Sequence, residues 1–116
     1  MIGDNAVLIL DDEILSAMGL KANLLAAGWG HVYIAGTYDR AMDILRKESP
    51  RTAVVDINLQ SEYSGLDFLR QATGLQRVVI LSGYGVASYE AELREIHYDA
   101  FLEKPAAFEK VIEALD

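Results

Sequence analysis

Three short stretches of the sequence are almost wholly apolar, and each of them ends at a polar residue. They cover residues 6–10, 53–55 and 78–81, and they contain many β-branched side chains. A strand that is apolar at every position is typical of a parallel sheet whose two faces are both covered. Residues 31–35 form a fourth candidate strand, and residues 100–103 form a weaker fifth. The sequence therefore predicts a sheet of parallel strands that are buried on both sides.

Patterns typical of helices lie between these stretches and after the last one. Good helix formers and apolar residues at helical spacing support these segments. We predict helices over residues 13–27, 38–48, about 64–73, 87–96 and from Pro105 onward, the last with an apolar face of Phe108, Val111, Ile112 and Leu115.

The ends of the predicted helices carry recognisable signals. Thr37 is placed to cap the start of the second helix, and residues 64–67, Ser-Gly-Leu-Asp, resemble a capping box at the start of the third. Gly28 and Gly74 follow the first and third helices, where glycine readily adopts the left-handed conformation that ends a helix.

Strand and helix patterns thus alternate five times along the chain. Such alternation predicts an α/β fold with a doubly wound parallel sheet, right-handed crossovers and helices on both faces. The chain has 116 residues, of which 52% are apolar, and this is enough for the core of one domain. Because no linker or repeat interrupts the pattern, we predict a single domain over residues 1–116.

The balance of charge excludes several classes of protein. The chain carries 10 Lys and Arg against 18 Asp and Glu, a net charge of −8. Proteins that bind nucleic acid or an anionic membrane through charge need a basic surface, so we expect neither partner. The absence of cysteine excludes disulfides, thiolate nucleophiles and cysteine-bound metals. Residues 1–5 lack the basic start of a secretory signal, and no apolar run approaches the roughly 18 residues of a membrane span, so we expect a cytoplasmic protein.

Polar side chains follow four of the five predicted strands at the point where each strand ends. They are Asp11 and Asp12, Asp56, Ser82 and Lys104. Because the carboxyl ends of parallel strands meet at one edge of a sheet, we expect these side chains to converge there. Three crowded carboxylates repel one another unless a cation lies among them, and oxygen ligands without His or Cys suit Mg²⁺.

The chemical types of these residues point to one reaction. A carboxylate nucleophile, a metal site, an ammonium group and a hydroxyl donor are what phosphoryl transfer to a carboxylate requires. Lys104 can pair with Asp56 or with an incoming phosphoryl oxygen. For any one of these positions, an ordinary polar turn residue is the simpler interpretation. For five such positions on four strands, the functional interpretation is favoured.

Taken together, these residues resemble the receiver domain of two-component response regulators. The resemblance rests on Asp11-Asp12-Glu13, Asp56, Ser82 and Lys104-Pro105, and it extends over essentially the whole chain. It implies a flavodoxin-like and CheY-like sheet of strand order 2-1-3-4-5 with five flanking helices. It also implies signalling in a phosphorelay, in which a sensor histidine kinase or a histidine phosphotransfer protein passes a phosphoryl group to this domain.

The resemblance implies a role for each matching carboxylate. Asp56 is the implied phospho-acceptor and a member of the Mg²⁺ site, in a domain that is not itself an enzyme. Asp12 is implied as a direct Mg²⁺ ligand, Asp11 as a ligand largely through water, and the Asn58 backbone carbonyl as a third protein ligand.

The remaining matches concern the phosphoryl group and the switch. Ser82 is implied to bond the phosphoryl group and to move inward on activation. Lys104 is implied to contact the phosphoryl oxygens, and its peptide bond to Pro105 is implied to be cis. The aromatic switch position on the fifth strand is Phe101, where the family more commonly has Tyr, so this side chain offers no hydroxyl.

The resemblance also implies partners beyond the phosphodonor. These are a downstream protein target or an attached output domain, and a homodimer is a further arrangement that the family allows. The stretches 56–59 and 81–85 are similar to a subgroup of receivers that is often found as stand-alone or atypically coupled domains. The sequence leaves open whether the chain acts alone or belongs to a longer regulator.

The first predicted helix has two apolar stripes. One can face the sheet and consists of Leu20, Leu24 and Ala27. The other lies about 140° around the helix and consists of Ile14, Met18 and Leu25. In the family this helix is where the kinase or phosphotransfer helices dock, so the second stripe is a candidate docking surface. The equal alternative is that the neighbouring fifth helix covers this stripe.

Two other functions stay open at this stage. One is a receiver fold that binds its partner without being phosphorylated, although such a module has no need of an intact set of Asp12, Asp56, Ser82 and Lys104. The other is a phosphatase that uses Asp56 as its nucleophile. Enzymes of that kind place a second Asp two residues later, where this chain has Asn58, so this hypothesis ranks third.

Overall fold

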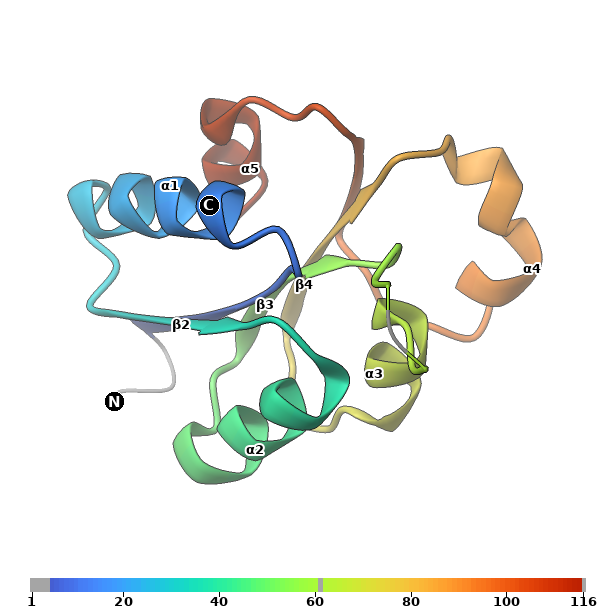
Figure 1. The fold of residues 1–116 in the computed structure, drawn as a ribbon, viewed down its shortest axis with the longest axis horizontal. Coiled ribbons are helices and arrows are strands. Elements are labelled where there is room, and N and C mark those ends of the chain that lie inside the picture. The colour runs from blue at the N-terminus through green and yellow to red at the C-terminus, as the bar shows by residue number, and fades with distance from the viewer. Residues whose placement is uncertain (1–4, 61, 116) are drawn as a thin grey trace.

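Five parallel strands form one sheet in the order β2-β1-β3-β4-β5 (Figure 1). The computed structural model describes residues 5–60 and 62–115. Within this part of the chain, the predicted α/β class and strand order are confirmed. Residues 1–4, on which the expectation about a secretory signal rests, lie outside the described residues, as does Asp116 at the end of the predicted domain.

Burial follows the position of each strand in the sheet. Every residue of the two central strands β1 and β3 is buried, whereas the edge strands β2 and β5 are only partly buried. Central strands have neighbours on both sides and helices on both faces, which explains their continuous apolar sequences. The strands are β1 (Ala6–Leu10), β2 (His31–Ala35), β3 (Thr52–Asp56), β4 (Arg77–Ser82) and β5 (Ala100–Glu103).

Helices cover both faces of this sheet. Figure 1 shows α1 and α5 on one face and α2 and α3 on the other. The helices are α1 (Ile14–Ala26), α2 (Tyr38–Glu48), α3 (Gly65–Gln71), α4 (Glu90–Leu93), α5 (Phe108–Leu115) and the short 3-10 helix η2 (Val86–Tyr89). In the described part of the chain, none of them combines the length and the apolarity that crossing a membrane would need.

Alternate residues of each central strand feed two separate hydrophobic cores. In β1, Val7 and Ile9 belong to the core under α1 and α5, whereas Leu8 and Leu10 belong to the core under α2 and α3. This alternation follows from the two-residue period of a strand. Both cores consist of hydrophobic side chains, and the polar side chains that end or follow these strands lie at the carboxyl edge of the sheet.

Local sequence signals explain where α2 and α3 begin. The Thr37 hydroxyl accepts a hydrogen bond from the Arg40 N–H at 3.2 Å, as the capping signal predicts. Ser64 and Asp67 form the predicted capping box, in which each side chain accepts from the backbone N–H of the other. Gly28 follows α1 with a positive φ of 108°, the conformation in which glycine ends a helix.

Three of the predicted helices differ in extent from those in the structure. Helix α3 ends at Gln71 rather than near Thr73, and α5 begins at Phe108 rather than Pro105, where its apolar period starts. The predicted helix over residues 87–96 is instead η2 followed by the single turn of α4. Only Leu93 is buried within η2 and α4, and neither has a side-chain cap, so little packing or capping supports a longer helix here.

The two apolar stripes of α1 have different environments. Leu20 and Leu24 are buried against the sheet, but Ala27, the residue after the end of the helix, is exposed. The alternative that α5 covers the second stripe is wrong. Its side chains remain exposed, with 49% for Ile14, 56% for Met18 and 44% for Leu25.

Helix α5 instead meets α1 at Gly19. A Cβ at this glycine would lie 2.8 Å from Cζ of Phe108, so the absence of a side chain lets the aromatic ring approach the helix. The contact places α5 beside the stripe that faces the sheet and leaves the second stripe uncovered.

Candidate functional site

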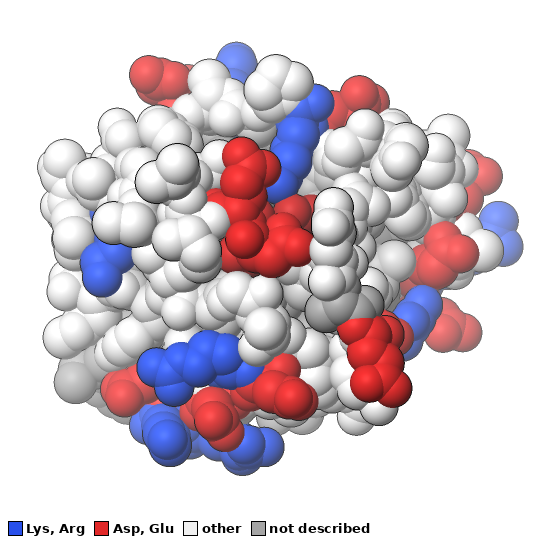
Figure 2. Space-filling view, in the orientation of Figure 1, with Lys and Arg blue, Asp and Glu red and all other residues white. Residues whose placement is uncertain are grey.

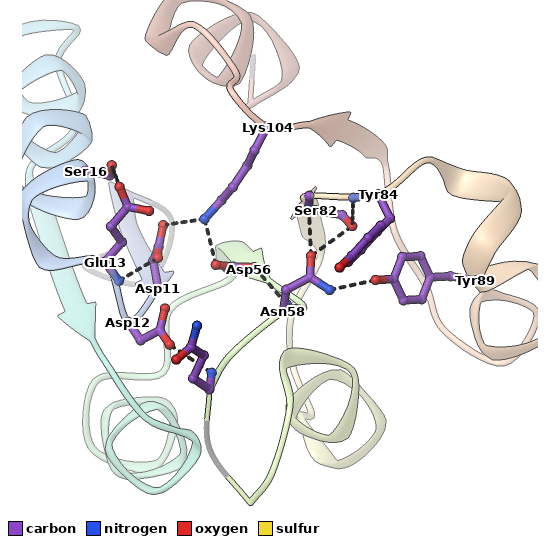
Figure 3. A network of polar contacts seen from close by, with 12 residues as sticks. Asp11, Asp12, Glu13, Ser16, Asp56, Asn58, Ser82, Tyr84, Tyr89 and Lys104 are labelled. Atoms are coloured by element: carbon purple, nitrogen blue, oxygen red, sulfur yellow. Dashed lines mark hydrogen bonds and ion pairs between the residues drawn. The ribbon is translucent and has the colours of Figure 1, made fainter.

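The register of the sheet brings the polar strand ends together. Leu10 lies beside Val55 in the pairing of β1 with β3, so the next residues, Asp11 and Asp56, are neighbours. The Lys104 N–H donates to the Ser82 carbonyl at 2.7 Å, which extends the β4–β5 pairing by one residue. Figure 3 shows the side chains from these strand ends converging on one region at the edge of the sheet.

Lys104 bridges the two buried carboxylates of this region. Its Nζ lies 2.7 Å from Oδ2 of Asp56 and 3.4 Å from Oδ2 of Asp11. The other oxygen of each carboxylate accepts a backbone hydrogen bond, from the Asn58 N–H at 2.8 Å to Asp56 and from the Glu13 N–H at 2.9 Å to Asp11. The two carboxylates are therefore fixed in place by four directed contacts rather than by packing alone.

Burial and charge act against each other at these groups. Desolvation raises the pKa of Asp11, although the Glu13 hydrogen bond and the Lys104 charge oppose that change. Desolvation would lower the pKa of Lys104, but the hydrogen bond and the charge of Asp56 outweigh it, and the pKa of the ammonium group is raised. Lys104 therefore remains charged at neutral pH and is the counterion of this region.

The acidic side chains have the arrangement of a cation site. One oxygen from each of Asp11, Asp12 and Asp56 lies within 4.8 Å of the others. Asp12 is exposed and is held by the Gln60 N–H, which donates to its Oδ2 at 2.9 Å. Figure 2 shows acidic side chains gathered near the centre of this face. One ammonium group balances only part of the charge of three carboxylates, and all the available ligand atoms are hard oxygens, so the residues fit a divalent ion such as Mg²⁺. We call Asp11, Asp12, Asp56 and Lys104 the charged half of the site.

Neutral hydrogen bonds organise the side of the site next to β4. The Ser82 hydroxyl is buried and donates to Oδ1 of Asn58 at 3.0 Å. The Gly83 N–H donates to the same oxygen at 2.7 Å, and the Tyr84 N–H donates to Oγ of Ser82 at 3.0 Å. Ser82 directly follows Leu81, which lies beside Asp56 in the pairing of β3 with β4, but the Ser82 hydroxyl is engaged by Asn58.

The Asn58 side chain also reaches the segment that follows β4. Its Nδ2 donates to the Tyr89 hydroxyl at 2.6 Å (Figure 3). The Tyr89 ring lies beside Phe101 of β5, with ring centroids 6.2 Å apart and an interplanar angle of 42°. We call Asn58, Ser82, Tyr84 and Tyr89 the neutral half of the site.

Sequence reasoning missed two members of the neutral half. It assigned only a backbone carbonyl to Asn58, whereas the structure also places the Asn58 side chain between β4 and η2. Its position two residues after Asp56 is a signal that could have drawn attention to that side chain. Tyr89 carries no comparable signal, because it lies in a charged segment that the sequence presents as an ordinary helix.

The residues proposed for docking lie apart from this network. Ile14, Met18 and Leu25 are on α1, which begins three residues after Asp11, and they are exposed. Leu15 is 84% exposed on the same helix and was not identified from the sequence. The peptide bond between Lys104 and Pro105 is cis, as the resemblance implies.

Comparison with known proteins identifies relatives over nearly the whole chain. The family model described as the response regulator receiver domain matches residues 7–116. The chain is 29% identical over 115 residues to the acid tolerance regulatory protein ActR of Rhizobium meliloti (strain 1021), and the match covers 97% of this chain. The chain spans only 58% of the length of that relative.

Solved structures show the same fold. A CheY-like response regulator receiver domain protein from Methanospirillum hungatei JF-1 superposes with a TM-score of 0.84 at 24% identity, covering 95% of this chain and 89% of that one. A response regulator protein from Burkholderia pseudomallei, solved with a phosphorylated aspartic acid, a calcium ion and citrate, has a TM-score of 0.83 at 27% identity. That match covers 97% of this chain and 67% of the other.

Proposed function

This chain belongs to the response regulator receiver domain family, and on that premise we propose that it is a phosphorylation-dependent signalling switch with Asp56 as its phospho-acceptor. The observation that carries the proposal is the environment of this carboxylate. Asp56 is buried at the end of a central strand, lies 2.7 Å from the Lys104 ammonium group and shares a cluster of oxygens with two further carboxylates. In this environment the carboxylate is shielded from water, and its two oxygens are oriented by the Asn58 N–H and by Lys104.

In the proposed reaction, a carboxylate oxygen of Asp56 attacks the phosphorus of a phosphohistidine on a partner protein. An O–P bond forms while the P–N bond to the imidazole breaks. The leaving nitrogen keeps the bonding electron pair and takes up a proton from solvent, and an acyl phosphate is left on Asp56. The reaction needs no oxidant or reductant. A small acyl phosphate donor reacts in the same way, except that the bond from phosphorus to the donor's carboxylate oxygen breaks and a carboxylate leaves in place of the imidazole.

The neighbouring residues have distinct tasks in this reaction. Lys104 holds the Asp56 carboxylate and would contact a phosphoryl oxygen once that carboxylate is modified. The Ser82 hydroxyl would donate to another phosphoryl oxygen after leaving Asn58. Asp11, Asp12 and Asp56, with the Asn58 carbonyl, would hold a divalent ion, which supplies positive charge where negative charge accumulates on the phosphoryl oxygens.

The resulting contacts would act as a switch. New bonds to the phosphoryl group favour one arrangement of Ser82 and of the segment after β4, and a two-state element responds by a shift of population. Phe101 lies on β5 beside that segment and would report the change at the surface formed by α4 and β5. The recipient of the signal would be a downstream protein or an output domain attached to this one.

The uncovered stripe of α1 is the proposed docking surface for the phosphodonor, a sensor histidine kinase or a histidine phosphotransfer protein. Ile14, Met18 and Leu25 are exposed on the helix that begins beside Asp11, so a partner seated there would lie next to the acceptor. Exposed apolar side chains of this kind are typical of surfaces that bind another protein.

Intact mass spectrometry after incubation with acetyl phosphate and Mg²⁺ tests the proposed acceptor. We expect the wild type to gain the mass of one phosphoryl group, and the gain to disappear without Mg²⁺ and in Asp56→Asn. The control Asp43→Asn changes an exposed carboxylate of α2 that pairs with Arg46, and it should be phosphorylated like the wild type. No gain in the wild type with either acetyl phosphate or a histidine-phosphorylated donor would instead favour an interaction module that works without phosphorylation.

The docking surface needs a separate experiment, because a small donor does not use it. We expect Met18→Glu to block transfer from a phosphorylated histidine phosphotransfer protein and to leave labelling by acetyl phosphate unchanged. Gln71→Glu places the same charge on an exposed residue of α3 and should leave both reactions intact. Loss of both reactions in Met18→Glu would show that the substitution disturbs the fold or the acceptor rather than docking.

A further inference from the structure

The orientation of the Asn58 amide follows from its neighbours. The Gly83 N–H can only donate, so the atom that faces it at 2.7 Å must be the amide oxygen. The opposite atom is then the amide nitrogen, which can only donate, and it faces the Tyr89 hydroxyl at 2.6 Å. The Gly83 N–H thus determines which way the amide points, and the Tyr89 hydroxyl holds its other end by accepting a hydrogen bond.

This orientation has a consequence for Ser82. A serine hydroxyl has one proton, and in this arrangement the proton is donated to Oδ1 of Asn58 at 3.0 Å. The Tyr84 N–H meanwhile occupies an acceptor position of the same hydroxyl. The Ser82 proton is therefore unavailable to any group on Asp56 until its bond to Asn58 breaks.

Tyr89 is itself held in place by packing. Its ring is half-buried at the margin of the core under α2 and α3, beside the ring of Phe101. Phe101 has no hydroxyl, and the hydroxyl that accepts from the Asn58 amide comes from η2 rather than from β5. A chain of contacts then runs from Phe101 through Tyr89 and Asn58 to Ser82.

We infer that Tyr89 is a positioning residue whose hydroxyl holds the Asn58 amide in the orientation that retains Ser82. The inference rests on the proposed function, because it assigns to Tyr89 a restraint on the step in which Asp56 accepts a phosphoryl group. Losing the Tyr89 hydroxyl loosens Asn58, frees the Ser82 proton and speeds phosphorylation. Conversely, a phosphoryl group that attracts Ser82 away from Asn58 weakens the hydrogen bond between Asn58 and Tyr89. The change is then transmitted to Phe101, whose ring lies beside that of Tyr89.

The experiment compares Tyr89→Phe with the wild type, using acetyl phosphate and Mg²⁺ and following the phosphorylated fraction by intact mass. One neutral hydrogen bond corresponds to about a two- to tenfold change in an equilibrium, and we expect an increase of that size in the initial rate. Tyr98→Phe removes a hydroxyl from another half-buried tyrosine beside the same core and should leave the rate unchanged.

A double-mutant comparison separates positioning from a general structural effect. If Tyr89 acts through Ser82, the rate increase caused by Tyr89→Phe should vanish when both proteins also carry Ser82→Ala. An increase that persists in the Ser82→Ala background, or a Tyr89→Phe rate equal to that of the wild type, would overturn the inference.

Amide hydrogen exchange provides a readout that does not depend on phosphorylation. The Gly83 N–H is bonded to Oδ1 of Asn58, so Tyr89→Phe should raise its exchange rate by about two- to tenfold, and Tyr98→Phe should not. If the wild type takes up no phosphate, the proposed function fails, and the Gly83 exchange rate still decides the role of Tyr89. Unchanged exchange at Gly83 in Tyr89→Phe would contradict that role.

Discussion

The charged half and the neutral half of the site are built on different supports. The three carboxylates of the charged half lie at the ends of the central strands β1 and β3, every residue of which is buried. The Lys104 ammonium group, from the end of β5, lies 2.7 Å from the Asp56 carboxylate. The neutral half depends on hydrogen bonds to a loop and to η2, which has no buried residue and no side-chain cap. The carboxylates are thus supported by strands that are buried along their whole length.

The two supports differ in how easily they can rearrange. Segments with few buried apolar contacts open at a lower free-energy cost than central strands do. The segment from η2 to α4 has only Leu93 buried, so it is the part of the site most able to change its arrangement. Substitutions that act on one half and not on the other can test this division.

The largest effect is expected from adding a methyl group at Gly65, where α3 meets β3. A Cβ at this position would lie 2.3 Å from the carbonyl oxygen of Asp56 and 2.8 Å from Cγ1 of Val55. Because β3 is enclosed on both faces and cannot move away, we expect Gly65→Ala to lower the free energy of unfolding by about 3 kcal/mol. Urea unfolding followed by circular dichroism measures the change.

The matched control makes the same substitution at Gly83, whose N–H is bonded to Asn58 of the neutral half. A Cβ at Gly83 would meet only Oδ1 of Asn58, at the ordinary contact distance of 3.8 Å. We expect Gly83→Ala to change the free energy of unfolding by less than about 0.5 kcal/mol. Equal losses in Gly65→Ala and Gly83→Ala would contradict the proposed difference in tolerance between the two halves.

A smaller loss is expected when the counterion of the charged half is removed. Lys104→Met leaves Asp11 and Asp56 buried without their ammonium partner, and we expect the free energy of unfolding at pH 7, in the presence of EDTA, to fall by about 2 kcal/mol. Lys110→Met removes an exposed lysine whose Nζ lies 4.0 Å from Glu113 and should have almost no effect.

The pH dependence of this loss follows from the raised pKa of Lys104. A cation whose pKa is raised on folding contributes stability below its ordinary pKa of 10.5, and this contribution disappears as the pH rises through the value in the folded protein. The difference between the wild type and Lys104→Met should therefore be constant near neutral pH and shrink only above pH 10.5. A difference that disappears near neutral pH would argue against the ion pair as its cause.

The smallest effect, and one of opposite sign, is expected at Asp11. Burial raises the pKa of Asp11 above its ordinary value of 3.8. The protonated carboxyl group therefore contributes to stability at low pH, and this contribution is lost as the pH rises through the pKa of Asp11 in the folded protein. At pH 7 the charged carboxylate is therefore a net cost, and Asp11→Asn should raise the unfolding midpoint in EDTA. Mg²⁺ should stabilise the wild type more than Asp11→Asn. A lower midpoint for Asp11→Asn in EDTA would contradict this account.

The sequence predicted the charged half more fully than the neutral half. Asp11, Asp56 and Lys104 each follow a recognisable strand, and the ends of parallel strands must share an edge. Caps at Thr37 and Ser64 were equally predictable, because the capping residue and its partner lie within one helical turn. The helix expected over residues 87–96 was not found in full, since its charged sequence has the spacing of a helix but little to bury.

By itself, the sequence determined the class of the fold, the order of its elements and the convergence of the polar side chains at the strand ends. These properties depend on short-range periodicity and on the common direction of parallel strands. Only the tertiary structure decided which groups hold Ser82, how closely Gly65 meets β3 and which face of α1 stays uncovered. The Asn58–Tyr89 bond joins the loop after β3 to a residue of η2 that lies 31 positions later, and nothing in the local sequence around either residue specifies that distance or that direction.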